Sequence, residues 1–391
     1  MNVNLIRLID KNDLITKEED DLLLEDISEQ LMEEDISLLE GVKNSPIDVI
    51  VVESDNVFTQ LEKQLKKLSK FIYIFTFCKN RSYSEAISLY NYLVKKKYHV
   101  LFDDDPLNSL KGIIPTYIDI ARVKEVTSNK TFGMFIYNEE NSELPKFNTG
   151  KLHDSFGISV IKIGKEELFK EYRKNKVGNP PHLLKMKKMV KNSQALNKTL
   201  YLYNAIKTIS EKYHLTGLSI DEKVIKKELG ISTNLALSLL NEEGIIAVSG
   251  NDLATLFSCY LAYILSSRIP FVVTPIRSNY EEKILSLRCD YPPLNQLKSY
   301  EIINPRDFDL EINSEINIGE SSLLKIGSDC TRFYALSSEI KESKDDNISL
   351  YIDEVPLFSF IRDLAEKQMV LVSQDISAQY TALLNYFDTE K

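Results

Sequence analysis

The chain has 391 residues, of which 43% are hydrophobic and 27% are charged, and its formal net charge is −10. These values are typical of a globular protein with two or three domains and exclude a disordered or fibrous chain. The acidic balance also argues against a protein whose whole surface binds nucleic acid, because such proteins are usually basic. Its four cysteines are scattered without a C-x-x-C pair, so neither a zinc knuckle nor a disulfide framework is expected.

The chain carries no sign of a membrane segment. Its first residues are too polar for a signal peptide. The most apolar stretch, residues 253–267, is shorter than the roughly 20 residues that span a bilayer. We interpret this stretch as a buried helix and expect a cytoplasmic protein with no membrane partner.

The first part of the chain alternates short apolar runs with amphipathic stretches. Continuous runs of β-branched and aromatic residues predict strands of a parallel sheet buried on both faces, at residues 3–8, 47–52, 71–77 and 99–102. Between the last two, apolar residues from Ala86 to Val94 recur at helical spacing. This alternation predicts a doubly wound α/β domain over residues 1–125.

A second series of the same kind follows, over residues 126–275. Its expected strands are residues 133–137, 158–163, 215–220 and 245–249. Expected helices include Gln194 to Tyr213 and a segment around Leu235 to Asn241. After Pro275 the strand-like segments come close together, which predicts a mostly antiparallel, β-rich domain over residues 276–391. In that last part, one helix is expected around Phe358 to Lys367.

The central block of the sequence resembles the L-fucose/L-arabinose isomerase superfamily, in particular its short archaeal and bacterial members. The resemblance is specific in LALSLLNEEGIIAVSGNDLATLFSCYLAYILSSRIPFVV, which begins at Leu235, and in ILSLRCDYPP, which begins at Ile284. Looser similarity extends from about Val3 to the C-terminus. The resemblance implies two flavodoxin-like α/β domains and a C-terminal β-rich domain, and therefore agrees with the layout that the periodicity predicts.

The family interconverts aldoses and ketoses with a divalent metal, usually Mn²⁺, which polarises the sugar oxygens while carboxylates move the proton. This chain departs from the family at three ligand positions. The glutamate of the family's CEGD motif falls on Gly250, and a histidine falls on Arg288. The late histidine pair falls within residues 366–369, which contain no histidine. The resemblance thus implies a degenerate metal site, and we expect no cofactor, with Mn²⁺ as the alternative.

Acidic residues remain near the lost ligands. Asp221 and Glu222 follow the expected strand 215–220, and Asp252 follows the SGN turn after strand 245–249. These acids, with Arg288 as an electrophilic donor, are the candidate catalytic residues of an isomerase with a relocated or metal-free site.

One segment is strongly basic. Residues 170–198 contain nine lysines and arginines and one acid, Glu171. The candidate partner-binding residues in it are Arg173, Lys174, Lys176, Lys185, Lys187, Lys188 and Lys191. An exposed patch of this kind can neutralise the phosphates of a bound partner. A lysine-rich helix face that only contacts solvent explains the pattern equally well. Tyr172 and His182 are candidates for stacking on bases or for hydrogen bonds to the partner.

A segment of opposite sign lies near the N-terminus. Residues 18–40 contain eleven acids and no basic residue. Leucines and isoleucines between the acids predict a pair of amphipathic acidic helices. The pair is either an ordinary packed element of the first domain or a docking surface for a basic partner.

These observations leave three functions open. The one we favour is a non-catalytic protein with an isomerase fold and a binding or regulatory role. Its basic segment would engage RNA, a ribonucleoprotein such as the ribosome, or a phosphorylated metabolite, with a macromolecule preferred because the patch is long. The alternative is an active aldose–ketose isomerase. A third possibility is an assembly subunit, as a homo-oligomer or beside an active paralogue.

Overall fold

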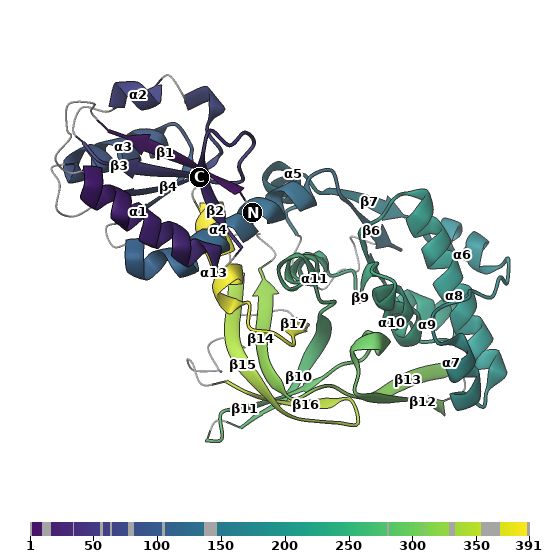
Figure 1. Cartoon of the computed structure of the whole chain (residues 1–391). Coiled ribbons are helices and arrows are strands. Elements are labelled where there is room, and N and C mark those ends of the chain that lie inside the picture. The colour runs from purple at the N-terminus through teal and green to yellow at the C-terminus, as the bar shows by residue number, and fades with distance from the viewer. Residues whose placement is uncertain are drawn as a thin grey trace. The chain divides into compact units, whose positions relative to one another are not determined.

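Figure 1 shows a computed structural model of the chain. It describes the backbone of residues 2–9, 17–33, 35–54, 58–62, 65–76, 82–103, 106–136, 147–279, 281–306, 308–327, 333–352 and 368–388. The helix expected around residues 358–367 lies outside these ranges. The chain divides into two compact units, residues 1–125 with 385–391, and residues 126–384.

The first unit contains a five-stranded parallel sheet, here sheet A. Its strands are β1 (Asn2–Leu8), β2 (Ser37–Glu40), β3 (Asp48–Val52), β4 (Phe71–Thr76) and β5 (His99–Asp103). Their order, β2-β1-β3-β4-β5, is the flavodoxin-like order of a doubly wound sheet. Every residue of β3 and β4 is buried, as the continuous apolar runs predict for central parallel strands.

Helices follow the strands of sheet A along the chain. They are α1 (Lys17–Met32), α2 (Phe58–Glu62), the 3₁₀ turn η1 (Leu65–Lys67), α3 (Tyr83–Lys95) and α4 (Pro106–Thr127). The predicted pair of acidic helices is wrong, because only α1 is helical and the chain then continues into strand β2. On α1, Leu24, Ile27 and Leu31 are buried, and Asp21 forms a 2.6 Å ion pair with Arg7 of β1.

The second unit begins with a four-stranded parallel sheet, sheet B, in the order β7-β6-β8-β9. Its strands are β6 (Thr131–Phe135), β7 (Ser159–Ile163), β8 (Gly217–Ile220) and β9 (Ile246–Ser249). The helices around it are α5 (Thr149–Phe156), α6 (Lys165–Tyr172), α7 (Leu183–Met189), α8 (Ser193–Lys212), α9 (Glu222–Leu229), α10 (Asn234–Glu242) and α11 (Leu253–Ser266).

A closed antiparallel barrel follows in the same unit. Its strands, in barrel order, are β10 (Phe271–Asn279), β11 (Ile284–Arg288), β16 (Asn347–Tyr351), β15 (Phe333–Lys344), β14 (Gly319–Ile326) and β17 (Met369–Val372). Side chains such as Phe271, Leu287, Leu323 and Leu350 fill its core. The predicted fold class, two parallel-sheet domains followed by a β-rich antiparallel region, is therefore confirmed.

A ribbon and a 3₁₀ turn belong to the second unit, and the residues of the last helix are divided between the two units at Leu384. A two-stranded ribbon, β12 (Ser299–Arg306) and β13 (Asp309–Glu315), extends beside α7, after the 3₁₀ turn η3 (Leu294–Gln296). Helix α13 (Ser377–Asp388) ends the described chain.

Helix α11 joins sheet B to the barrel. It contacts β8 and β9 of the sheet and β10, β14 and β17 of the barrel. Burial on both sides explains why its sequence is apolar around nearly its whole circumference. Among the described residues, no helix combines the length and apolarity that a membrane crossing requires.

Candidate functional site

Three of the four candidate catalytic residues, Asp221, Glu222 and Asp252, lie where β8 and β9 end, which is the edge of an open parallel sheet where α/β proteins bind ligands. Asp221 and Glu222 follow β8, and the turn from Ser249 to Asp252 follows β9. The turn is fixed to its neighbour, because the Gly250 N–H donates to the Ile220 carbonyl over 2.8 Å. Gly250 has a φ of +88°, and no described atom lies within 4 Å of a Cβ placed there. Glycine therefore suits this left-handed turn, and it has no side-chain atom that could bind a metal.

Asp221 and Asp252 both begin helices. The Asp221 carboxylate accepts from the Val224 N–H over 3.2 Å at the start of α9. The Asp252 carboxylate accepts from the Thr255 N–H over 2.9 Å at the start of α11. An aspartate at this position satisfies a helix N–H and complements the positive end of the helix. Each of the two acids therefore has a structural role that accounts for its residue type.

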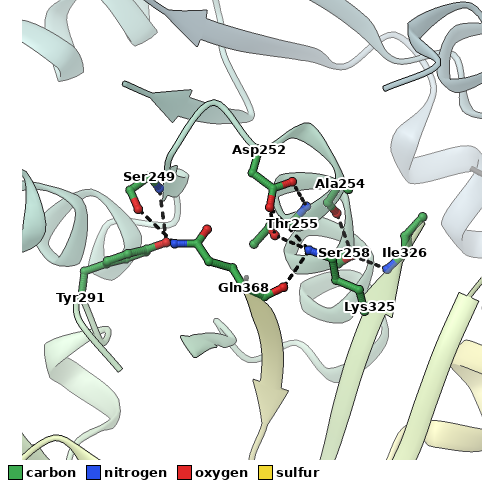
Figure 2. Close-up of polar contacts among 9 residues, drawn as sticks. All are labelled: Ser249, Asp252, Ala254, Thr255, Ser258, Tyr291, Lys325, Ile326 and Gln368. Carbon is green, nitrogen blue, oxygen red and sulfur yellow. Dashed lines mark hydrogen bonds and ion pairs between the residues drawn. The ribbon is translucent and has the colours of Figure 1, made fainter. Parts of the chain in front are cut away.

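Asp252 also forms a buried ion pair with Lys325 of β14 (Figure 2). The Lys325 ammonium lies 3.4 Å from Asp252 Oδ2, and the lysine side chain is 0% exposed. It donates to Thr255 Oγ1 over 2.8 Å and to the Gln368 carbonyl over 2.7 Å. Thr255 in turn donates its hydroxyl proton to Asp252 Oδ2 over 2.5 Å. This closed network satisfies the lysine charge inside the protein, where an unpaired charge would be costly.

A second set of hydrogen bonds joins the β9 turn to the barrel side (Figure 2). Gln368 Nε2 donates to Ser249 Oγ over 3.1 Å, and the Ser249 N–H donates to the Tyr291 hydroxyl over 3.2 Å. Burial raises the pKa of Tyr291 well above its ordinary value, so the phenol stays neutral. Gln368, within residues 366–369 where the resemblance places histidines, thus supplies an amide and a carbonyl that bind protein groups.

These residues do not fit a divalent metal. A metal at this edge would use Asp252, but a buried ammonium already lies beside that carboxylate and would repel a second cation. Gly250 has no donor atom, and Arg288 is itself a cation. Within the described ranges, no three His, Cys, Asp or Glu side chains are grouped to hold a metal ion.

Glu222 and Arg288 belong to a separate group of charges near the start of α9. Arg288, at the end of β11, forms a 2.8 Å ion pair with Asp290 and keeps half of its side chain exposed. Burial, and secondarily the charge of Asp290, raises the pKa of Glu222. Burial likewise raises the pKa of Asp346 to about 6, against the favourable charge of Arg288. The structure therefore associates Glu222 with Arg288, and Asp252 with Lys325.

The basic segment, defined as residues 170–198, consists of the end of α6, a loop, α7 and the start of α8. All seven candidate binding residues have exposed side chains: Arg173, Lys174, Lys176, Lys185, Lys187, Lys188 and Lys191. Two of them have partners, since Lys174 pairs with Glu171 over 2.5 Å and the Lys185 ammonium lies 3.9 Å from the centre of the Tyr300 ring. For the other five, no contact with another described side chain is recorded.

The residues expected to stack on bases are already engaged. Tyr172 packs edge-on against Tyr201, with 6.1 Å between ring centres. His182 Nε2 lies 3.0 Å from Glu242 Oε1. The exposed chemistry of the segment is therefore cationic, with Val177 and Leu184 as its exposed apolar side chains.

Sequence reasoning missed the residues that organise the carboxyl end of sheet B, above all Lys325, Gln368 and Tyr291. One signal was available for Lys325, because a lysine between Leu324 and Ile326 in an apolar strand predicts a buried charge that needs a partner. Thr255, three residues after Asp252 and before an apolar run, fits a helix start. No local pattern identifies Gln368 or Tyr291 as partners of the β9 turn.

Comparisons with known proteins give little further information. No family model matches the chain, and no curated protein matches it. Several solved structures match the chain, and two of them illustrate the level of similarity. One is a cysteine-to-alanine mutant of D-threo-3-hydroxyaspartate dehydratase in the metal-free form, with 11% identity, 90% of this chain and 75% of that chain covered, and a TM-score of 0.17. The other is D-threo-3-hydroxyaspartate dehydratase from Delftia sp. HT23, with 12% identity, coverage of 92% and 89%, and the same TM-score of 0.17. Likeness at this level supports no conclusion on fold or function.

Proposed function

We propose that the protein is a non-catalytic relative of the L-fucose/L-arabinose isomerases that binds an anionic macromolecule, RNA or a ribonucleoprotein such as the ribosome, through its basic segment. The proposal rests on a difference between two groups of charged side chains, those at the carboxyl end of sheet B and those in the basic segment. At the carboxyl end of sheet B, Asp221 and Asp252 cap helices, and Asp252 also pairs with Lys325. In the basic segment, eight cationic side chains are exposed, Lys170 and the seven candidate binding residues.

Exposed cations attract a polyanion most strongly where few acids lie among them, and the sequence of this segment is poor in acids. Glu171 is the one acid in residues 170–198, and its ion pair with Lys174 uses it. Lys187 and Lys188 lie in the last turn of α7, where the helix dipole favours positive charge. A phosphate backbone that follows the loop and α7 would release counterions as it binds, which makes the affinity depend strongly on salt.

The contacts of Tyr172 and His182 within the protein bear on how the protein would recognise RNA. Because Tyr172 packs on Tyr201 and His182 pairs with Glu242, base stacking is not the expected source of affinity. Contacts to phosphates position a protein on RNA but do not read its sequence. We therefore expect binding with little dependence on sequence.

The test compares two triple variants by fluorescence anisotropy with a labelled single-stranded RNA. The first changes Lys187, Lys188 and Lys191 to glutamine, because these side chains are exposed and their removal breaks no recorded contact. The control changes Lys95, Lys96 and Lys97, three exposed lysines at the end of α3, and removes the same charge from the other unit. We expect at least about a tenfold loss of affinity at ~0.1 M salt for the first variant and little change for the control. Equal losses in both variants, or no RNA binding by the unmodified chain, would contradict the proposal.

One observation favours the isomerase alternative. Glu222 is partly buried with a raised pKa, as a general acid requires, and the charge of Arg288 acts on it. An assay of ketose formation over a panel of pentoses and hexoses, with and without Mn²⁺, decides this case. Turnover that is lost in Glu222→Gln would replace the binding proposal, whereas no turnover with any sugar removes the alternative.

A further inference from the structure

Strand β5 is an edge strand of sheet A. It lies at the end of the order β2-β1-β3-β4-β5, and all five of its residues are half-buried, whereas every residue of its neighbour β4 is buried. Among the described elements, β5 packs mainly against β4 and α3. An edge strand presents a row of N–H and C=O groups that its own sheet does not pair, and these groups are able to pair with another strand.

The hydrogen bonds to β4 show which groups of β5 face outward. The His99 N–H donates to the Lys70 carbonyl over 2.9 Å, and β5 then continues in parallel register with β4. In a parallel pair, alternate residues of a strand bond to the neighbour, so every second residue from His99 onward bonds to β4. The N–H and C=O groups of Val100 and Phe102 therefore point away from sheet A.

The centre of β5 lacks the features by which exposed edges usually avoid pairing. Its three central residues, Val100, Leu101 and Phe102, are apolar, and the strand contains neither proline nor lysine. The other edges of the two parallel sheets differ, because β2 ends in the exposed Glu40, β7 carries the exposed Lys162, and β9 is fully buried. Charged side chains on an edge oppose pairing with another chain, so β5 is the edge that best suits a partner strand.

The two ends of β5 carry charges of opposite sign. The exposed lysines Lys95, Lys96 and Lys97 precede the strand, which ends at Asp103. When two copies of β5 pair antiparallel, the basic end of each copy lies beside the acidic end of the other. A parallel pair would place like charges together, which is unfavourable. The strand is therefore complementary in charge to a second copy of itself, in the antiparallel direction only.

The outward groups and the charges together select one register for such a pair. With Val100 of one copy opposite Phe102 of the other, each of these residues exchanges both its N–H and its C=O bond with the residue opposite. In this register Leu101 lies opposite its own copy on a twofold axis, and His99 lies opposite Asp103. A β-branched residue opposite an aromatic one is also a favourable cross-strand pair.

An apolar stripe on α3 extends the same surface. Tyr83, Ile87 and Val94 are 40%, 38% and 44% exposed and lie on one side of the helix, with the half-buried Tyr90 between them. The rings of Tyr83 and Tyr90 lie against Phe102 of β5, with ring centres 5.5 and 6.3 Å apart. The stripe thus flanks the β5 edge. A twofold axis perpendicular to the sheet keeps both copies of α3 on the same face, so the two stripes meet.

We propose that the first unit binds a second copy of this chain through β5, with the two strands antiparallel across a twofold axis, so that sheet A continues from one copy into the other. The strand pairing satisfies the outward groups of Val100 and Phe102, and contact between the α3 stripes removes apolar surface from water. A twofold interface closes on itself and gives a dimer. It lies in the first unit and serves no step of RNA binding by the basic segment, so either proposal can fail without the other.

The first test is sedimentation equilibrium of the RNA-free full-length chain at about 1–100 µM, where we expect a monomer–dimer equilibrium. Leu101→Lys places two lysines opposite each other on the axis and should weaken the dimer at least about tenfold. Ile87→Lys, on the exposed stripe, should weaken it about threefold to tenfold. Leu39→Lys is the matched control, because Leu39 is an exposed leucine on β2 at the other edge of sheet A, and it should leave the dimer unchanged.

The second test reports the register by oxidative cross-linking. Leu101→Cys places the two new cysteines directly opposite each other, with Cα atoms about 4.5–5.5 Å apart, a separation that a disulfide spans. Val100→Cys is the comparison, because its two copies lie diagonally, more than about 7 Å apart. We expect a covalent dimer to form faster with Leu101→Cys. The parent chain, with its four native cysteines, gives the background.

Several results would overturn the proposal. A chain that stays monomeric at about 100 µM has no such interface, and an assembly larger than a dimer does not close around one twofold axis. A dimer that Leu101→Lys leaves intact, or that Leu39→Lys weakens equally, uses another surface. Faster cross-linking of Val100→Cys than of Leu101→Cys contradicts the register. Thermal melting of each variant identifies a loss of fold, and Ile87→Lys with the cross-linking test decides the case if Leu101→Lys does not fold.

Discussion

Charged side chains are used differently at the carboxyl end of sheet B and in the basic segment. In the first region, Asp252 receives hydrogen bonds from Thr255 and lies beside a lysine with 0% exposure. In the second, side chains such as Lys187 and Lys191 extend into solvent. A charge that the fold has already satisfied adds stability but is not available to a ligand, whereas an exposed charge contributes little to stability and remains available. The comparison therefore separates charges that the fold already uses from charges that remain available to a partner.

The largest effect is expected for Lys325→Met. This change removes the cation from a buried pair and leaves the Asp252 carboxylate uncompensated, which costs about 3–5 kcal/mol of the free energy of unfolding. Urea denaturation measures the loss. The double variant with Asp252→Asn restores part of the stability, because no buried charge then remains unpaired. A single variant as stable as the unmodified chain would show that the pair is not buried as described.

The second-largest effect is expected in the salt dependence of RNA binding. Each phosphate contact with single-stranded RNA contributes about 0.7 to the slope of log affinity against log salt concentration. Replacing Lys187, Lys188 and Lys191 by glutamine should therefore reduce that slope by about 2 while leaving the melting temperature unchanged. Anisotropy titrations at several salt concentrations measure the slope. An unchanged slope with a lower affinity would mean that these lysines act on the fold and not on phosphates.

The smallest effect is the pH dependence of stability that Asp346 contributes, and its exposed neighbour Asp345 provides the control. The pKa of Asp346 in the folded state, about 6, is higher than the ordinary value of 3.8, so the folded state binds a proton more tightly than the unfolded state. This contribution to stability is present at low pH and is lost as the pH rises from about 4 to about 6. Asp346→Asn removes this dependence, and Asp345→Asn retains most of it, because the charge of Asp345 is the smallest of the causes that raise the pKa of Asp346. Urea midpoints at pH 4, 5 and 6 measure both, and parallel profiles for the two variants would contradict the assignment. Asparagine also tolerates the positive φ of 64° at this position.

Much of the fold is predictable from local sequence patterns. Apolar runs at residues 47–52 and 71–77 identify β3 and β4 because central parallel strands are buried on both faces. The apolar stretch that begins at Leu253 identifies α11 because that helix is buried all round. Short and half-exposed elements were missed, such as β2 within the acidic segment and the ribbon of β12 and β13. Their side chains alternate between protein and solvent over few residues, so the local signal is weak.

The site was predictable only in part. Its position at the strand ends of sheet B follows from the βα alternation and from the resemblance. The pairing of Lys325 with Asp252 does not follow, because the two residues are 73 positions apart and meet only when the barrel packs on α11. Exposure of Lys187 or Lys191 is likewise a property of packing, since a lysine-rich helix has the same sequence whether a partner covers it or not.

The most direct test of the comparison is hydrogen–deuterium exchange of the unmodified chain with and without single-stranded RNA. RNA that binds the basic segment slows exchange of amides in residues 173–191. In the same experiment, we expect RNA to leave the exchange rates of residues 249–252 and 288–291 unchanged, because the charges at the carboxyl end of sheet B already interact within the fold. Slower exchange at residues 249–252 and 288–291, without protection of residues 173–191, would contradict the account.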